Sequence, residues 1–580
     1  MTQVSAKLIE RRKVSAGLLD SLPDDLHPVL RRVYAAREVD PGALDTSLAA
    51  MIPVSRLDGC KAAADRLALA REAGQRVLVL GDFDADGATA TSLVITCLRA
   101  FGFKDPVYLV PDRFRFGYGL SPALVVEAAE LAPDIILTVD NGISSNAGVA
   151  AANERGIDVI VTDHHLPGET LPEACVIVNP NVPDNTFPSK NLAGVGVAFY
   201  VMAALGQRLA AEDCLDAGTA RSIVADCLDL VALGTVADLV PLDQNNRILI
   251  SQGLGRIRAG RARPGLQALF AAADRSCSDA AAGDLGFAIA PRLNAAGRLT
   301  DMMLGIDCLL SDSFPDARKR AAHLSDLNVE RRELQAAMQA EAEQILCGLE
   351  NQQAGPGDSA VCLYDAGWHQ GIVGLVATRI REQLGRPVIA FAPGENDKML
   401  KGSGRSVQGV HLRDVLAGID ARYPELLGRY GGHAMAAGLS LDADKLKPFR
   451  QAFIEEVDLY ADRIEESDRL LSDGALEAAD LNLGLAETLR FSGPWGQGFP
   501  EPVFDGRFQL ISQRVVGKRH LKLKLKPANS SATVSGIAFN QPELDIRSGD
   551  PELNVAYRLD VNEFRGVREH QLLVVHIECV

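Results

Sequence analysis

Residues 77–87 read VLVLGDFDADG, in which a short apolar run passes directly into three alternating aspartates. A helical pattern follows this stretch. The same order of apolar run, polar turn and helix returns at 134–154, and a further apolar run at 157–162 ends in Asp-His-His at 163–165. Repeated units of strand, turn and helix predict an α/β domain with a parallel sheet whose strands are buried.

Acidic and imidazole side chains follow these expected strands at their carboxyl ends. Side chains that end neighbouring parallel strands converge at one sheet edge, which is where open α/β sheets bind ligands. Several carboxylates in one crevice repel one another, so either a cation neutralises them or one of them is protonated. Carboxylate oxygens with one or two imidazoles suit Mn²⁺ or Mg²⁺ rather than a structural zinc. The residues are Asp82, Asp84, Asp86, Asp140, Asp163, His164 and His165.

Two simpler interpretations compete with a metal site. A lone aspartate after a strand is usually a helix N-cap or a turn residue, but three acidic segments that each close an apolar strand weaken that interpretation. Gly194-Val195-Gly196 resembles part of a dinucleotide fingerprint, yet it follows no strand and lacks the third glycine, so we expect a helix start there. The sequence contains no Walker A loop and no HExxH motif, which favours hydrolysis without ATP.

The composition is that of a globular protein with several domains. Of the 580 residues, 47% are hydrophobic and 23% are charged, and the length suggests roughly four domains. No apolar run approaches the roughly 18 residues of a membrane helix. Ten scattered cysteines without a CxxC pair predict reduced thiols and a cytoplasmic location. The net charge of −17 disfavours non-specific coating of nucleic acid, although basic residues can still gather in a groove.

The pattern of the second half predicts three further parts. A charged, proline-poor stretch from 314 to 349 is typical of one long spacer helix. The chain is again α/β from 360 to 441, and we expect the glycine-rich segment 402–406 to be a loop. Five short strand patterns after residue 472 fit a small closed barrel of the OB type.

Four segments resemble, in order, the motifs of the DHH phosphoesterases. They are Asp84-Ala85-Asp86-Gly87, Asp140-Asn141-Gly142, Asp163-His164-His165 and Gly234-Thr235-Val236-Ala237-Asp238. PDR at 111–113, GYGL at 117–120 and PRLNAAGR at 291–298 narrow the resemblance to the RecJ single-strand-specific exonucleases. GWHQGIVG at 367–374, GSGRS at 402–406 and GGH at 431–433 are similar to the DHH-associated domain. The resemblance covers about residues 50 to 580 in collinear order.

This resemblance implies the domain organisation. A parallel-sheet DHH domain and a smaller α/β DHH-associated domain are joined by a long helix, and an OB-type β-barrel ends the chain. The expected segments are an N-terminal helical arm (1–50), the DHH catalytic domain (51–265), a connecting segment with the spacer helix (266–350), the DHH-associated domain (351–445), a linker helix (446–471) and the OB-fold nucleic-acid-binding domain (472–580).

The resemblance also implies two metal ions, Mn²⁺ or Mg²⁺, with Asp140 as the carboxylate that bridges them. The expected ligands are Asp82, Asp84, Asp86, Asp140, His164 and Asp238. Asp86, His164 and Asp238 would complete one site and Asp84 would lie in the other. Many relatives carry a histidine four positions before the first motif aspartate, where this chain has Leu80, so we expect Asp82 to substitute. His165 beside the metals would contact a phosphoryl oxygen, which makes His165 and Asp140 the expected catalytic residues.

Substrate-binding residues follow from the same comparison. The resemblance implies that the two arginines of the 291–298 segment line the active-site cleft and neutralise phosphate charge. It also implies that Arg113, Ser403 and Arg405 hold the 5′-phosphate and that His433 contacts the nearby backbone. Tyr118 would stack on a base or belong to the core. The residues are Arg113, Tyr118, Arg292, Asn294, Arg298, Ser403, Arg405 and His433. In the barrel, Lys518, Lys522 and Lys524 belong to a basic run whose lysines alternate with leucines. This run is either a solvated strand face or a groove that tracks the phosphates of a single strand.

The resemblance therefore implies a cytoplasmic 5′→3′ exonuclease that would degrade single-stranded DNA to mononucleotides in recombinational and mismatch repair. The family suggests a single-strand-binding protein and a helicase as partners, and we expect a monomer and no membrane. Two alternatives stay open at this point. One is a DHH phosphodiesterase for short oligonucleotides or cyclic dinucleotides, and the other is an inactive DHH scaffold that binds DNA.

Overall fold

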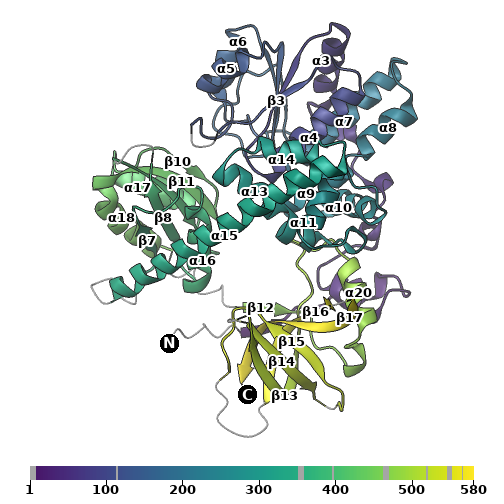
Figure 1. The fold of residues 1–580 in the computed structure, drawn as a ribbon, viewed down its shortest axis with the longest axis vertical. Helices are drawn as coiled ribbons and strands as arrows, with labels where there is room; N and C mark the ends of the chain where they lie inside the picture. The colour runs from purple at the N-terminus through teal and green to yellow at the C-terminus, as the bar shows by residue number, and fades with distance from the viewer. Residues whose placement is uncertain are drawn as a thin grey trace. The chain divides into compact units, whose positions relative to one another are not determined.

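The computed structural model describes residues 8–112, 115–350, 358–394, 398–460, 469–517, 520–528, 530–544, 552–564 and 566–579. The chain forms two compact units, which we call the larger and the smaller unit (Figure 1). The smaller unit comprises Met1–Glu10 and Asn328–Leu471, and the larger one comprises Arg11–Leu327 and Ser472–Val580. The C-terminal barrel thus belongs to the same unit as the N-terminal sheet.

The larger unit contains the predicted parallel sheet. Its five strands lie in the order β3 (Val107–Leu109), β2 (Val77–Leu80), β4 (Ile135–Val139), β5 (Asp158–Thr162) and β6 (Val176–Val178), and every neighbouring pair is parallel. The buried apolar runs confirm the prediction for β2, β4 and β5. The edge strands β3 and β6 could not be predicted from an apolar run, because each has only three residues and is partly exposed.

Both faces of this sheet are covered, which explains why its strands are continuously apolar. Val79 and Leu137 point into the core formed with helices α3, α4 and α7, whereas Leu78 and Ile136 point into the core formed with α5 and α6. Because β2, β4 and β5 are adjacent and parallel, the loops that follow them lie side by side. The described α-helices that precede β5 are α1 (Ala16–Ser21), α2 (Pro28–Ala35), α3 (Cys60–Glu72), α4 (Ala85–Ala100), α5 (Pro122–Ala129) and α6 (Asn146–Asn153).

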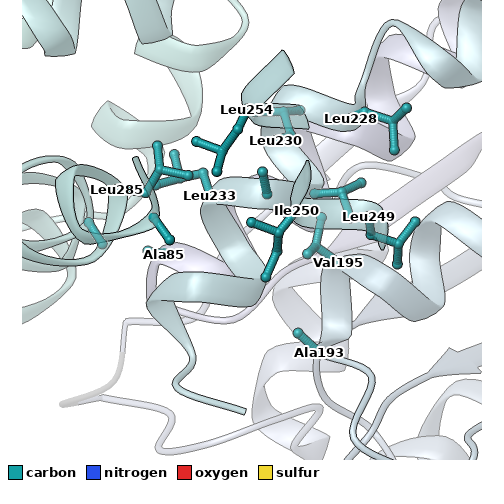
Figure 2. Close-up of a cluster of buried hydrophobic side chains, with 14 of the residues drawn as sticks. Ala85, Ala193, Val195, Leu228, Leu230, Leu233, Leu249, Ile250, Leu254 and Leu285 are labelled. Atoms are coloured by element: carbon teal, nitrogen blue, oxygen red, sulfur yellow. The ribbon is translucent and has the colours of Figure 1, made fainter. Parts of the chain in front are cut away.

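A helical layer packs behind the sheet and supports its acidic edge. Its members are α7 (Gly194–Ala211), α8 (Ala217–Ala225), α9 (Leu228–Ala237), α10 (Gln244–Arg258), α11 (Pro264–Ala272), α12 (Ala282–Asp284), the π-helix η5 (Leu285–Ile289), α13 (Ala290–Leu299) and α14 (Met303–Leu309). Figure 2 shows the core between them, where Val195 of α7 and Leu233 of α9 lie near Ile250 and Leu254 of α10. Ala85 at the start of α4 belongs to the same cluster, so the acidic loop before it rests on a packed core.

Helix α7 is also long and apolar enough to cross a membrane by length and composition. In this structure 72% of its apolar window is buried, as in the core helix of a globular protein. The predicted spacer helix is α15 (Phe314–Glu350), which runs across the boundary between the two units.

The smaller unit is a mixed sheet with helices, as predicted for the second α/β part. Its strand order is β10 (Tyr430–Gly432), β11 (Ala436–Asp442), β9 (Met399–Arg405), β8 (Val388–Pro393) and β7 (Val361–Tyr364), and only the β7–β8 pair of these is parallel. Among the described residues of this unit, the α-helices after α15 are α16 (Val373–Leu384), α17 (Leu412–Arg422) and α18 (Leu446–Asp458).

One expectation for this unit differs from the structure. The sequence predicts a loop at 402–406, but all of this segment except Ser406 lies in strand β9. Glycine is required there by packing, since a Cβ on Gly402 would lie 2.5 Å from the Phe391 ring. Part of the predicted linker helix at 446–471 is α18 at 446–458, which buries Phe449 and Phe453 in the core of this unit. Residues 461–468 of that segment lie outside the described residues.

The C-terminal segment forms a closed five-stranded barrel, in agreement with the prediction of an OB-type domain. The strand order is β13 (Phe504–Val516), β14 (His520–Pro527), β15 (Val534–Ala538), β17 (Val567–Cys579) and β16 (Glu552–Phe564), with β15 and β17 parallel. Helix α20 (Leu483–Phe491) precedes the barrel, and the strands β1 (Leu8–Arg11) and β12 (Arg469–Ser472) form a separate two-stranded sheet.

The N-terminal arm is attached to the region that leads into the barrel. Arg37 donates to both carboxylate oxygens of Asp473, at 2.6 and 3.0 Å, and both side chains are buried. Arg11 makes a similar pair with Asp505, and the hydroxyl of Tyr34 donates to a backbone carbonyl of Ser492. The arm therefore joins the two ends of the chain within the larger unit.

Candidate metal centre and nucleic-acid interface

The end of strand β4 places Asp140 at the middle of the acidic edge. Asp140 is buried and adopts a left-handed backbone conformation with a φ of 62°, and its backbone N–H donates to the Thr162 carbonyl at the end of β5. Non-glycine residues in this conformation are uncommon and cluster at functional sites. The strained turn directs the Asp140 carboxylate toward the neighbouring strand end.

The loop after β2 supplies three carboxylates. Asp84 is the N-cap of α4, since its Oδ1 accepts from the backbone N–H groups of Asp86 and Gly87 at 2.9 and 3.1 Å. The capping interpretation is thus correct for one oxygen of Asp84, and the second oxygen remains for another role. Gly87 is needed because a Cβ there would lie 2.6 Å from the backbone of Asp82.

Asp86 is held by the first turn of helix α7. Its Oδ2 accepts from the Gly194 N–H at 2.6 Å, and its Oδ1 accepts from the Val195 N–H at 3.0 Å. The glycine pair at 194 and 196 starts a helix, as predicted. Its contribution to the acidic centre was not predicted, because backbone N–H groups carry no side-chain signature.

The Asp-His-His motif divides into two roles. Asp163 is fully buried and points back into the fold, where it accepts from the Ile143 N–H and lies 2.7 Å from Nδ1 of His165. His164 points the other way, and its Nε2 lies 3.1 Å from Asp140 Oδ1 and 3.4 Å from Asp238 Oδ2. Asp163 is therefore a positioning residue, and His164 belongs to the carboxylate cluster.

Asp163 and His165 stabilise each other's charged forms. Burial opposes ionisation of Asp163, but the hydrogen bond and charge of His165 outweigh it, so the pKa of Asp163 lies below its ordinary value. Burial also opposes the charged form of His165, but the hydrogen bond and charge of Asp163 raise the pKa of His165 to about 9. The hydroxyl of Tyr118 donates to the Asp140 carbonyl and lies 3.0 Å from Nδ1 of His165.

Three groups of potential ligand atoms lie at this edge. Within each group, the ligand atoms all lie within 4.8 Å of one another. They are Asp82, Asp84 and Asp140; Asp86, His164 and Asp238; and Asp140, His164 and His165. Asp140 shares one group with Asp82 and Asp84 and another with His164, so it lies between the two halves of the cluster. This is the arrangement expected of a bridging carboxylate.

The carboxylates of the cluster are short of positive charge. Burial and the neighbouring Asp84 raise the pKa of Asp86 to about 7. Burial and the charge of Asp86 raise the pKa values of Asp140 and Asp238 well above the ordinary range. A divalent cation would relieve this repulsion, and carboxylates with one imidazole fit Mn²⁺ or Mg²⁺.

Leu80 offers no ligand at the position where many relatives have histidine. Its side chain is fully buried in the core beneath α5 and α6. Asp82 instead lies with Asp84 and Asp140, which supports the expectation that it substitutes for the missing ligand.

Helix α13 carries the 291–298 segment along the acidic loop. Asn294 Oδ1 accepts from the Ala85 N–H at 2.8 Å, and a Cβ on Gly297 would lie 1.8 Å from the Phe83 carbonyl oxygen. Arg292 donates to Ser325 Oγ at 2.8 Å, and Arg298 is half-buried. The structure thus gives Asn294 a role in holding the loop, while substrate contacts by Arg292, Asn294 and Arg298 stay predictions.

In the smaller unit, strand β9 presents Ser403 and Arg405 at the start of α16. Arg405 donates to Ser403 Oγ at 3.1 Å, and a Cβ on Gly374 would lie 2.8 Å from that oxygen. Burial and the charge of Arg381 lower the pKa of Arg405. Two guanidinium groups and a helix N-terminus together suit a phosphate. Arg381 was not predicted, because it lies in α16, outside the glycine-rich segment, and His433 is exposed after β10.

A groove of about 830 Å³ runs over the barrel exterior. Lys522 and Lys524 are exposed on one face of β14, as their alternation with leucine predicts, and Arg514 lies opposite Lys522 on β13. His570 lines the same groove. Arg514 and His570 were not predicted because they come from other strands. Arg113 and Lys518 lie outside the described residues.

Known proteins match the chain along most of its length. The family models described as DHH family, N-terminal domain, DHHA1 domain and RecJ OB domain match residues 76–235, 357–458 and 472–576. A single-stranded-DNA-specific exonuclease RecJ of Dickeya dadantii (strain 3937) is 51% identical over 568 residues, which cover 96% of this chain and 97% of the relative.

Two solved structures of RecJ from Thermus thermophilus share the fold. The complex with Mn²⁺ is 32% identical with a TM-score of 0.79 and covers 99% of this chain and 80% of that chain. The complex with Mg²⁺ is 30% identical with a TM-score of 0.73 and covers 99% and 78%. Given this identity over nearly the full length, with all three domain models in order, the chain belongs to the RecJ family.

Proposed function

We propose that this protein is a metal-dependent exonuclease that degrades single-stranded DNA from the 5′ end to 5′-mononucleotides. The observation that carries the proposal is the position of Asp140 between two groups of acidic and imidazole side chains at one sheet edge. The relatives named as single-stranded-DNA-specific exonucleases match this chain over nearly their full length. Residues 51–265 would form the catalytic domain.

Mn²⁺ or Mg²⁺ is the cofactor that these residues fit. Asp82, Asp84 and Asp140 would hold one ion, and Asp86, His164 and Asp238 would hold the other. When held there, two such ions would supply an activated water and would stabilise the leaving oxygen of an in-line displacement at phosphorus.

The protein's own residues orient this chemistry. The amides of α7 fix Asp86, and the αL turn fixes Asp140. Asp163 and Tyr118 hold the His165 ring from one edge, which directs the ring toward the phosphoryl group in this proposal. His165 and Asp140 are the catalytic residues we propose.

The smaller unit would bind the 5′ end. Ser403, Arg405 and Arg381 lie together and offer donors and positive charge for a terminal phosphate. His433 would contact the nearby backbone of the strand, and Arg113 is proposed for the 5′-phosphate on the family resemblance alone. The barrel would bind the rest of the strand. Its groove carries Lys522, Lys524 and Arg514 in an otherwise acidic protein, and cationic grooves on OB folds track single-stranded backbones.

The biological setting is recombinational repair and mismatch repair, as the family implies. We further propose that the protein works as a cytoplasmic monomer, on strands opened by a helicase and coated by a single-strand-binding protein. A phosphodiesterase for short substrates would not need the barrel groove, and an inactive scaffold would not need the ligand residues of the acidic cluster.

Digestion of end-labelled oligonucleotides tests the proposal. The full chain should shorten a 5′-phosphorylated single strand from its 5′ end with Mn²⁺ or Mg²⁺, leave a blunt duplex intact, and be inactive in EDTA. Cleavage of dinucleotides or cyclic dinucleotides but not of a long single strand would favour the phosphodiesterase alternative. Binding without any cleavage would favour the scaffold alternative.

A further inference from the structure

Leu239 immediately follows Asp238 and adopts a backbone conformation that leucine rarely takes. Its φ is 59°, in the left-handed region, at the first position after the C-cap of α9. Glycine is the usual residue at this position, because its missing Cβ removes the steric clash. The other described non-glycine residues with positive φ are acidic, asparagine or alanine, so a large apolar side chain stands out at 239.

The Leu239 side chain is also in contact with solvent. It is 69% exposed, so the strain of its backbone is not offset by burial in the core. Glycine at this position would satisfy the turn with less strain. Residues with a strained backbone of this kind cluster at active sites and ligand-binding sites. The conformation of Leu239 therefore suggests a function for its side chain.

Other exposed apolar residues belong to segments that carry the ligand residues or pack on them. Leu166 directly follows His165 and is 59% exposed, and the half-exposed Tyr118 lies against His165. Phe287 on the π-helix η5 is 87% exposed, and its neighbour Gly286 packs on Val236, two residues before Asp238. A single exposed apolar residue needs no explanation, but four of them next to the ligand-bearing motifs do.

A single strand presents two chemistries to this surface. Its phosphates suit the cations, whereas its unpaired bases have apolar faces that are poorly solvated and stack on apolar or aromatic side chains. Apolar residues around an acidic metal site would suit such a strand. The phosphate backbone would lie at the metal ions in the centre, and the bases would lie against the apolar residues at the edge.

We propose that Leu239, Leu166 and Phe287 extend the base contact that the family resemblance implies for Tyr118 into an apolar rim that receives the nucleobases of the strand at the metal centre, with Leu239 in direct contact with a base. This inference rests on the proposed function. It adds a base-reading surface to a site otherwise described by its phosphate chemistry.

Leu239→Gly tests the rim without threatening the fold, since glycine relieves the strained turn. We expect a melting temperature equal to or above that of the wild type, Mn²⁺ affinity within about twofold, and a KM for a short single strand raised about five- to tenfold. The kcat should stay within about twofold. Asp213→Gly is the matched control, because Asp213 has a φ of 55° and is exposed after α7, and it should leave KM unchanged.

An abasic substrate shows whether the lost contact is to a base. Single tetrahydrofuran residues at the first, second or third position from the 5′ end are assayed with wild type and Leu239→Gly. If Leu239 contacts a base, the effects of the variant and of one abasic position will not add. Affinity for the same oligonucleotides in EDTA should show the same non-additivity.

Three results would overturn the rim. They are an unchanged KM in Leu239→Gly, additive effects at all three abasic positions, and loss of Mn²⁺ affinity, which would mean that Leu239 acts through Asp238. Failure of the wild type to degrade DNA would instead contradict the proposed function, so the two ideas fail separately.

Discussion

Gly194 lies against Asp140 so closely that no side chain fits between them. A methyl group on Gly194 would lie 2.5 Å from Asp140 Cβ and 2.6 Å from its Oδ1. The same glycine donates its N–H to Asp86. One backbone position at the start of α7 therefore sets the spacing of one carboxylate and the orientation of another.

Gly194→Ala should disturb the acidic centre while the rest of the fold survives. The added methyl must push Asp140 away, and displacements of about 1 Å at a catalytic group lower rates by about a hundredfold. We expect Mn²⁺ affinity to fall at least about tenfold and hydrolysis to fall with it. Isothermal titration with Mn²⁺ and a nuclease assay measure the two effects.

Gly196→Ala is the matched control for that variant. It lies in the same helix turn, but its Cβ would meet only the end of the flexible Leu192 side chain, at 3.0 Å. Replacing a helical glycine with alanine can also stabilise by about 0.5–1 kcal/mol. Near-normal Mn²⁺ binding is therefore expected in Gly196→Ala, and equal losses in both variants would refute a specific role of Gly194.

Asp140→Asn should abolish hydrolysis and leave DNA binding intact. Asparagine tolerates the left-handed conformation of residue 140, so the change removes the bridging charge with little distortion. Activity should fall by roughly three orders of magnitude or more, while single-strand affinity in EDTA stays within about threefold. Hydrolysis within about tenfold of the wild type would contradict the two-metal interpretation.

Arg405→Ala should lower kcat/KM for 5′-phosphorylated substrates more than for 5′-hydroxyl substrates. A hydrogen bond to a charged group contributes about 1.5–3 kcal/mol, equivalent to about one to two decades in kcat/KM. The ratio of kcat/KM for the two substrates is the measurement. Arg413→Ala, an exposed arginine at the start of α17, serves as the control. An equal effect on both substrates would rule out a terminal-phosphate pocket at Ser403 and Arg405.

The double variant Lys522→Ala/Lys524→Ala should lower the salt dependence of single-strand binding. Each lost phosphate contact reduces the slope of log K against log salt by about 0.7, so the pair should reduce it by about 1.4. Titrations from low to moderate salt measure the slope. The control double variant Lys61→Ala/Lys104→Ala removes two exposed charges away from the barrel, and an unchanged slope in the test variant would assign the barrel another task.

The acidic centre could be predicted from sequence because its residues follow rules of strand geometry. Apolar runs identify buried parallel strands, and residues that follow adjacent strands must meet at one edge, which brings Asp84, Asp140 and His164 together. The expectation that Asp82 substitutes for a missing ligand came instead from the family resemblance, which places a histidine at the position of Leu80. The family resemblance added the polymer and the direction, which geometry alone does not contain.

Other features depend on packing between distant segments and leave no local pattern. Gly402 lies in strand β9 and is glycine because the Phe391 ring leaves no room for a Cβ, whereas sequence rules favour a loop for such a glycine-rich segment. The support of Asp86 comes from backbone amides 108 residues away. Arg292 contacts Ser325 because of the direction its side chain takes from α13, and the helix pattern alone does not fix that direction.

The ion pair between Arg37 and Asp473 has a consequence for biosynthesis. The partners are 436 residues apart, and at translation rates of about 5–20 residues per second the second partner emerges roughly 20 to 90 s after the first. During that interval the N-terminal arm has no Asp473 to bind, and Tyr34 lacks its Ser492 acceptor. During this interval the arm is not anchored to the nascent sheet domain by these contacts. Chaperones and proteases therefore have access to the arm until residues 473 and 492 have been synthesised.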